Sequence, residues 1–411
     1  MFENILCTAP LVSVLVDTNK GIRPCCYYDA WKVGYLGNLK TESIINIFNN
    51  TEYKKLKQQM YSKEWPEGCL SCKKSEDETG TSLRNIFYTK NDVDFKDYAQ
   101  ENLTYIEFNG SNICNLSCLH CHPGFSSKWV IEKEKVLKFA KTLDHDSWEK
   151  INQFRAITSF DDDSKMQTTK MHLPNPQLIV DNLSQIDLTH IKKISFKGGE
   201  PLLNSETEAA LEFLNGKDLL KNITVHVVTN GTYINENILH LLSQCKYVHY
   251  QISVDGVDEL FNYIRYGDAK FNSIEPTIKK CNMLNNIDIR FNVAVMNYNA
   301  YNLLDIKLWI DQMSAKYNRV NGTDAFSIIV QSPEYLSVGT LSDNTRKELV
   351  EFYTNHNHTH DFDFVINKLL NDYSGHELHN KWVHYTEVME KVRKNNILDI
   401  VPQLKNELQY F

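Results

Sequence analysis

The stretch 114-CNLSCLHCHPG-124 decides the fold of this chain. It places three thiols at C-x3-C-x2-C spacing: Cys114, Cys118 and Cys121. It directly follows 104-TYIEFNG-110, whose alternating apolar residues predict a strand. Thiols this close together are typical of metal or cluster ligands, yet such sites usually take four protein ligands. The neighbouring histidines, His120 and His122, are the nearest alternatives for a fourth.

Beyond this loop, predicted strands and helices alternate for about six units, ending near residue 335. This alternation predicts an α/β fold with a partial (β/α)6 TIM-like barrel. A helix is expected over 125–142, and the polar interval 143–175 is interpreted as an insertion or lid. The remainder of the chain is expected to form a helical C-terminal extension over 336–411.

Composition limits the classes of partner. The chain has 411 residues and a net charge of −8, and it contains no dense run of Lys and Arg, so nothing favours a nucleic-acid partner. The N-terminus MFENILCTAP lacks the features of a secretory signal. No apolar run approaches the roughly 20 residues of a membrane helix. We therefore expect a cytoplasmic protein with no membrane partner.

The ten cysteines are unevenly distributed. Five precede the three-cysteine loop: Cys7, Cys25, Cys26, Cys69 and Cys72. Cys245 and Cys281 stand alone in apolar-periodic segments and are expected to be buried structural thiols. Clustered thiols without an export signal favour metal or cluster binding over disulfides.

The block upstream of the barrel, residues 1–95, mixes short strands and helices. LVSVLVDTNKGIRPCC (11–26) predicts a β-hairpin with its turn at Asp17–Gly21. The spacing of apolar residues over 43–62 predicts a helix with a break near Asn49–Thr51. Cys69 and Cys72 then follow in a predicted turn. We interpret this block as a small α+β domain ahead of a barrel over 96–335.

Three further motifs stand where predicted barrel strands end. They are Gly198-Gly199-Glu200-Pro201, Thr229-Asn230-Gly231 and Ser253-Val254-Asp255-Gly256. In parallel barrels, the C-terminal ends of the strands and the loops after them build the active site. All three motifs are therefore expected to lie around the same mouth as the three-cysteine loop.

Each motif has a chemical reason to be there. The paired glycines allow close approach of a ligand to the backbone, and Glu200 adds an acceptor for an ammonium group. Ser253 and Asp255 lie two apart on a strand, so they share a face and can bind vicinal ribose hydroxyls. Arg265 can pair with a carboxylate. These groups describe a pocket for an amino acid joined to a nucleoside, which is S-adenosylmethionine (SAM).

With these motifs, residues of about 104–335 resemble the radical SAM superfamily. The resemblance implies that Cys114, Cys118 and Cys121 hold a [4Fe–4S] cluster whose open iron binds SAM. An electron then cleaves SAM to a 5′-deoxyadenosyl radical, which abstracts hydrogen from a substrate. A flavodoxin- or ferredoxin-type reductant is implied. So are these cofactor-binding residues: Gly198, Gly199, Glu200, Pro201, Thr229, Asn230, Ser253, Asp255 and Arg265. One departure is His120, where the family usually has an aromatic residue.

The upstream block resembles the twitch and SPASM modules that carry auxiliary clusters in radical SAM enzymes. The resemblance implies one auxiliary [4Fe–4S] cluster on four thiols: Cys7, Cys25, Cys69 and Cys72. Cys26 is an alternative to Cys25. Too few thiols remain for a second auxiliary cluster, so twitch is the better name. In this chain the module precedes the barrel, whereas in many relatives it follows it.

Several alternatives stay open at this stage. The three-cysteine loop could bind zinc with His122 as fourth ligand, the upstream thiols could form a zinc knot, and the protein could be a non-catalytic iron–sulfur carrier. Twitch and SPASM relatives often act on peptides or proteins, so a peptide or protein substrate is expected, with a small molecule as the alternative. With four protein ligands, the auxiliary cluster is expected to transfer electrons.

Overall fold

The computed structural model describes residues 5–18, 20–85, 100–142 and 172–408. The chain forms two compact units. Unit 1 comprises Met1–Ser111, Leu173–Val228 and Asn235–His249, and unit 2 comprises Asn112–His172, Thr229–Ile234 and Tyr250–Phe411. The boundary predicted between residues 95 and 96, and most of the insertion predicted over 143–175, lie outside the described residues. The predicted domain division therefore stays a prediction.

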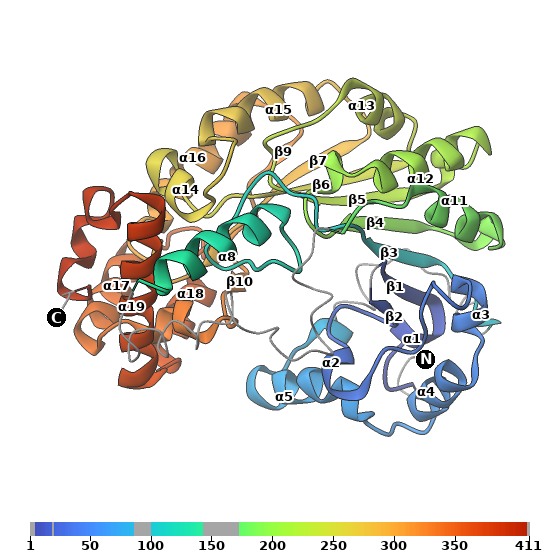
Figure 1. Cartoon of the computed structure of the whole chain (residues 1–411), viewed down its shortest axis with the longest axis horizontal. Coiled ribbons are helices and arrows are strands. Elements are labelled where there is room, and N and C mark those ends of the chain that lie inside the picture. Colours follow the sequence, from blue (N-terminus) through green and yellow to red (C-terminus); the bar gives the residue numbers. More distant parts are fainter. Residues whose placement is uncertain (1–4, 19, 86–99, 143–171, 409–411) are drawn as a thin grey trace. The chain divides into compact units, whose positions relative to one another are not determined.

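Unit 1 is built on strands in the order β2-β1-β3-β4-β5 (Figure 1). Their bounds are β1 Ser13–Asp17, β2 Gly21–Arg23, β3 Tyr105–Asn109, β4 Lys193–Lys197 and β5 Thr224–Thr229. From β1 to β5 the pairs are parallel, and β2 is antiparallel to β1. The helices that follow or connect these strands are α11 (Pro176–Ser184), α12 (Ser205–Gly216) and α13 (Glu236–Ser243).

The predicted N-terminal hairpin is confirmed, with Leu15 opposite Arg23 and Asp17 opposite Gly21. Its first strand starts later than expected, because Ala9–Val12 form a single helical turn, α1. The structure adds a contact that the sequence did not reveal. Strand β1 pairs in parallel with β3 over its whole length, so the hairpin of the upstream block extends the sheet that carries β3 and β4.

The helices of the upstream block follow the predicted pattern in part. The predicted break separates α3 (Ile44–Phe48) from α4 (Thr51–Tyr61), and Asn50 caps α4 by accepting the Tyr53 N–H at 2.9 Å. The turn predicted around the C-x2-C pair was wrong. Cys69 ends a 3-10 helix, and Cys72 lies in the first turn of α5 (Leu70–Thr79).

Unit 2 contains β7 (Ile287–Asn292), β9 (Val320–Asn321) and the last four residues of β6 (Tyr247–Ser253), again in chain order. The helices between them are α14 (Asp258–Ile264) and α15 (Ile274–Cys281), which both follow β6, and α16 (Leu303–Lys316), which precedes β9. Near the predicted end of the alternation, Ile328–Ile329 form β10. It pairs with β8 (Ala294–Val295) outside the larger sheet, while the unpredicted β9 pairs with β7.

The C-terminal extension is helical, as predicted. It contains α17 (Asp343–His356), α18 (Asp363–Asn371) and α19 (Gly375–Arg393) (Figure 1). Trp382 and Tyr385 of α19 are fully buried, so this helix contributes to the core of unit 2. Cys245 and Cys281 are buried as expected, and all ten cysteines are free.

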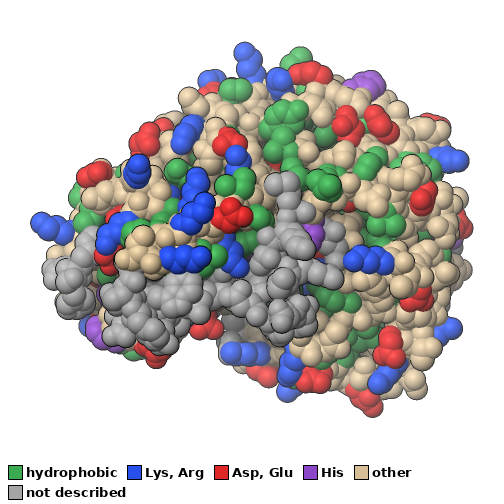
Figure 2. All heavy atoms as spheres, viewed as in Figure 1, with side chains coloured by type: hydrophobic (Ala, Val, Ile, Leu, Met, Phe, Trp, Pro, Cys, Tyr) green, Lys and Arg blue, Asp and Glu red, His purple; other side chains and the backbone are tan. Residues whose placement is uncertain are grey.

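The fold is therefore of the predicted α/β class. Parallel strands follow one another in chain order and alternate with helices, as in a partial (β/α)6 barrel. None of the helices in the described part of the chain is long and apolar enough to cross a membrane. On the molecular face shown in Figure 2, acidic and basic side chains are interspersed.

Candidate functional site

The three-cysteine loop of unit 2 leads into α8 (Ser127–Ala140). Ser126 is the N-cap of this helix and accepts the Trp129 N–H at 3.2 Å, while its hydroxyl donates to the Leu116 carbonyl. Ser127 donates to the Cys114 carbonyl at 3.1 Å. The first turn of α8 therefore holds the first part of the loop in place.

Three side chains hold the backbone carbonyls at the centre of the loop. Trp129 Nε1 donates to the Cys118 carbonyl at 2.7 Å, Tyr385 Oη to the Leu119 carbonyl at 3.0 Å, and Arg393 Nη2 to the Ser117 carbonyl at 2.6 Å. Trp129 is fully buried, as expected for a core residue. Tyr385 and Arg393 come from α19, so the C-terminal extension fixes the thiol-bearing loop.

The thiols of this loop face a buried cation. Cys118 is buried, and Arg265 Nη1 lies 3.8 Å from its sulfur. Burial and the neighbouring Cys118 raise the pKa of the Cys121 thiol to about 12. The pKa of Arg265 is raised: burial lowers it, but Asp255, Cys118 and Cys114 outweigh that effect. Three soft sulfur donors on one rigid loop fit an iron–sulfur cluster.

Arg265, which directly follows α14, pairs with a carboxylate as predicted for its charge, but this carboxylate is that of Asp255 in the protein itself. Its Nε lies 2.8 Å from Asp255 Oδ2, and Asp255 is 0 % exposed. The other Asp255 oxygen accepts the Ala294 N–H at 2.8 Å. Burial lowers the pKa of nearby His120 to about 4, and Asp255 opposes this effect. Ribose binding by Asp255 and by half-buried Ser253 stays a prediction.

The Thr-Asn-Gly motif also lies in unit 2, where it supports the three-cysteine loop. Asn230 Nδ2 donates to Asn115 Oδ1 at 2.8 Å, and Asn115 Nδ2 donates to Thr232 Oγ1 at 2.9 Å. Thr229 is buried, and its hydroxyl accepts the Gly231 N–H at 3.0 Å. This motif therefore positions the segment next to Cys114.

The Gly-Gly-Glu-Pro motif belongs to unit 1 and follows β4. Gly198 has φ +118°, and the Gly199 N–H donates to the Ser111 carbonyl at 3.3 Å. Glu200 is 1 % exposed and caps a short 3-10 helix that begins at Pro201, with its Oε1 accepting the Leu202 N–H at 3.2 Å. The predicted contact of Glu200 with an ammonium group stays a prediction.

Replacing Gly198 with alanine is expected to destabilise the protein by about 1–3 kcal/mol. A Cβ at this position would lie 3.0 Å from the Gly110 backbone nitrogen, and the positive φ strains any L-residue. The control is Gly216→Ala, because Gly216 ends α12 and a Cβ added there would meet nothing within 4 Å. Urea unfolding midpoints measure both. Equal stability of the Gly198→Ala variant and the natural protein would contradict this expectation.

The histidine that could complete a zinc site has other contacts. His122 Nδ1 accepts the Gly124 N–H at 3.2 Å, and its ring packs against Phe125 with centroids 4.9 Å apart. Among residues that the structure describes, no three His, Cys, Asp or Glu side chains gather as closely as a single metal ion requires.

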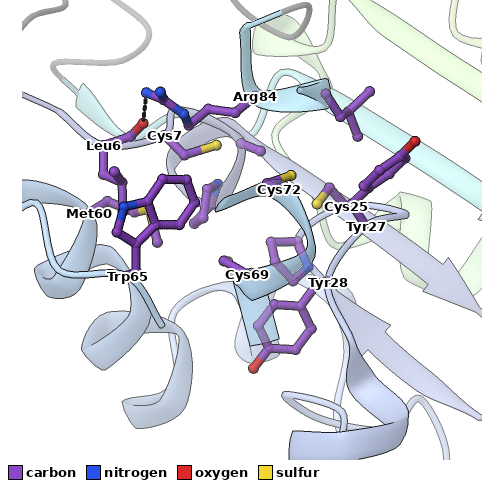
Figure 3. Close-up of a pocket in the computed structure, with 14 residues that line it drawn as sticks. Leu6, Cys7, Cys25, Tyr27, Tyr28, Met60, Trp65, Cys69, Cys72 and Arg84 are labelled. Carbon is purple, nitrogen blue, oxygen red and sulfur yellow. Dashed lines mark hydrogen bonds between the residues drawn. The ribbon is translucent and has the colours of Figure 1, made fainter. Parts of the chain in front are cut away.

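The upstream thiols converge on one pocket in unit 1 (Figure 3). The pocket has an empty volume of about 470 Å³, which includes space open to solvent. Cys7, Cys25, Cys69 and Cys72 all line it. The rest of the lining is mostly apolar or aromatic: Leu6, Ala9, Pro10, Pro24, Tyr27, Tyr28, Met60, Trp65, Leu83 and Arg84. Four thiols around an apolar pocket fit a cluster with four protein ligands.

The positive charge of Arg84, which lines this pocket, is balanced by Glu76 and not by a thiolate. Burial raises the pKa of both Cys7 and Cys69 to about 12, so these thiols are protonated unless a cationic centre binds them. Arg84 donates to the Leu6 carbonyl at 2.7 Å and pairs with Glu76 at 2.6 Å. It thereby ties the segment before Cys7 to α5.

The position of Cys26 distinguishes it from Cys25. Cys26 is exposed and does not line the pocket, whereas Cys25 does. Cys25→Ala is therefore expected to lose about four irons per chain after anaerobic reconstitution, and Cys26→Ala to lose none. Iron and acid-labile sulfide analysis measures both variants. The reverse result would assign the ligand to Cys26.

Two regions of the chain match family models. Residues 108–302 match the Radical SAM superfamily, and residues 7–73 match SPASM, an iron–sulfur cluster-binding domain. The second match contains all four thiols of the pocket, and the first contains the three-cysteine loop. No curated protein sequence matches the chain.

Solved structures also resemble the chain, at low identity. Native anSMEcpe with bound AdoMet is 18% identical over 65% of this chain and 62% of that chain, with TM-score 0.40. Streptococcus suis SuiB bound to precursor peptide SuiA is 14% identical over 69% and 58%, with TM-score 0.36. The chain thus spans about three fifths of the length of these structures.

Proposed function

We propose that this chain, a member of the radical SAM superfamily with an iron–sulfur cluster-binding domain ahead of its barrel, is an enzyme that reductively cleaves SAM and abstracts hydrogen from a substrate. The observation that carries the proposal is the presence of two thiol sets of different size. Three thiols stand on one fixed loop in unit 2, and four line one pocket in unit 1. Three protein ligands leave one cluster iron for SAM.

The residues around the three-cysteine loop have defined tasks in this proposal. A bound cluster and SAM would supply the electron transfer and the 5′-deoxyadenosyl radical. The chain itself fixes the loop through carbonyl contacts from Trp129, Tyr385 and Arg393. Arg265 places a positive charge beside Cys118, which favours the thiolate that a cluster requires. Burial of Cys118 and Arg265 limits the access of water.

The test is formation of 5′-deoxyadenosine and methionine from SAM. Protein reconstituted with iron and sulfide under anaerobic conditions is reduced with dithionite, and the products are quantified by liquid chromatography. The Cys118→Ala variant sets the background, because it removes a proposed cluster ligand. Product above this background is the expected result. Product equal to it would refute the proposal.

The substrate that we propose is a peptide or protein, with the auxiliary cluster of the four-thiol pocket transferring an electron. This choice is supported by the SPASM match and by the fourfold thiol set, which leaves no iron free for a substrate. The alternative is a small-molecule metabolite. Deuterium transfer from labelled peptides or metabolites into 5′-deoxyadenosine separates the two classes. We propose the cytoplasm as the compartment and a flavodoxin or ferredoxin as the reductant.

A further inference from the structure

Strands β3 and β4 of unit 1 alternate between apolar and polar residues, which is unusual for a parallel sheet. Parallel strands covered on both faces normally read as near-continuous apolar runs. In β3 and β4, by contrast, Ile106 and Phe196 are buried on one face, and Glu107 and Ser195 lie paired on the other. Strand β7 of unit 2 alternates between buried and half-buried residues. The face of β3 and β4 that carries Glu107 and Ser195 is therefore polar, unlike the apolar face expected of a covered parallel sheet.

A continuous polar network crosses this face of unit 1. Lys197 Nζ donates to Glu107 Oε2 at 2.9 Å, and Tyr105 Oη lies 2.7 Å from the same oxygen. Tyr105 Oη also lies 3.0 Å from Ser195 Oγ, which is 3.3 Å from His226 Nδ1. The network links β3, β4 and β5, and Tyr105, Glu107 and Ser195 are all at least nine-tenths buried.

One oxygen atom of this network lacks a hydrogen-bond partner among the described residues. Glu107 is 5 % exposed, and its Oε1 is buried with no hydrogen-bond partner among the described residues. A buried carboxylate oxygen left unpaired is costly, so a donor from a ligand is the expected complement. Lys197 is accessible, with 29 % of its side chain exposed, and its ammonium group has donors beyond the one given to Glu107.

The charge of the pair indicates which ligand fits. Lys197 and Glu107 form an ion pair at 2.9 Å, and the pKa of Lys197 is raised because Glu107 outweighs the opposing effect of burial. A charged ligand group would bring an uncompensated charge to this face. A neutral amide fits, because its N–H can donate to Glu107 Oε1 and its carbonyl can accept from Lys197 Nζ.

We propose that Glu107 and Lys197 bind an amide group of the substrate, in the peptide main chain or in a carboxamide side chain. The inference rests on the proposed function and deepens it by naming the substrate group.

The test compares an amide with its ester analogue. The probes are N-methylacetamide, which carries a single amide group, and methyl acetate, in which oxygen replaces the N–H. Binding to the reconstituted protein is measured by ligand-observed NMR titration. The natural protein is expected to bind the amide on the order of tenfold or more tightly than the ester, because a hydrogen bond to a charged group is lost. Equal binding, or no binding of either probe, would overturn the proposal.

Two variants test whether Glu107 and Lys197 cause the preference for the amide over the ester. Glu107→Gln is expected to lose most of the amide preference, and Lys197→Met to weaken both probes by about tenfold. The control is Glu275→Gln, which removes an exposed carboxylate paired with Lys316 and should leave the ratio unchanged. An unchanged ratio in a folded Glu107→Gln protein would refute the assignment. Because binding needs no SAM cleavage, failure here is distinguishable from failure of the proposed function.

Discussion

The Cys69→Ala/Cys72→Ala double variant is expected to keep most 5′-deoxyadenosine formation and to lose product formation completely. Both thiols line the four-thiol pocket of unit 1, whereas the three-cysteine loop belongs to unit 2. Removing two of four ligands should empty the auxiliary site without changing the contacts that hold the loop. If the auxiliary cluster accepts the electron left after hydrogen abstraction, SAM cleavage then proceeds without completing the reaction.

This expectation is measured with the substrate found by deuterium transfer. The two quantities are 5′-deoxyadenosine and modified substrate, each per chain and per unit time. Cys26→Ala is the matched control, because Cys26 does not line the pocket. Full turnover by the double variant would contradict an electron-transfer role for the auxiliary cluster.

The Arg393→Met variant is expected to lose about 3–5 kcal/mol of stability, the usual effect of leaving one partner of a buried ion pair alone. Arg393 Nε lies 2.7 Å from Glu132 Oε1, and both side chains are almost fully buried. The guanidinium carbon also lies 4.6 Å from the centroid of the Tyr266 ring, a cation–π contact. Its contact with the Ser117 carbonyl is lost as well, so iron retention by the loop should fall.

Two further variants separate charge from packing. Lys391→Met lies on the same helix, and its pair with Glu387 is exposed, so its effect should stay within about 1 kcal/mol. The Arg393→Met/Glu132→Met double variant removes both buried charges and should recover much of the lost stability. Chemical unfolding of the reconstituted proteins, followed by tryptophan fluorescence, measures all three. A wild-type unfolding midpoint for Arg393→Met would contradict the account of this pair.

Local signals predicted much of the fold. The hairpin, the break between α3 and α4, and the alternation of strands and helices all follow from residue spacing and turn residues. The position of Cys69 and Cys72 on helical segments was missed, because a short polar stretch also suits a turn. The parallel pairing of β1 with β3 joins residues about ninety apart, and no local pattern encodes it.

In the candidate site, too, residues with a local sequence signal were predicted, and residues that act from distant segments were missed. Thiol spacing identified the four cysteines that line one pocket of unit 1, and the Thr-Asn-Gly motif identified Asn230, which contacts the three-cysteine loop within unit 2. Tyr385 and Arg393 were missed, because they act from α19, far along the chain. Glu107 and Lys197 were missed as well. The alternation in YIEFN and KISFK was the available signal, because a parallel strand covered on both faces has little reason to carry it.

The central claim is that the chain holds one cluster with three protein ligands and an iron free for SAM, and a second cluster with four protein ligands. Measurement of iron and sulfide content tests this claim most directly. Anaerobically reconstituted protein should contain about eight irons and about eight acid-labile sulfides per chain. The Cys7/Cys25/Cys69/Cys72 to alanine variant should keep about four of each, and SAM should shift the electron paramagnetic resonance spectrum of its reduced cluster. Zinc without sulfide in either site, or a spectrum that SAM leaves unchanged, would contradict the account.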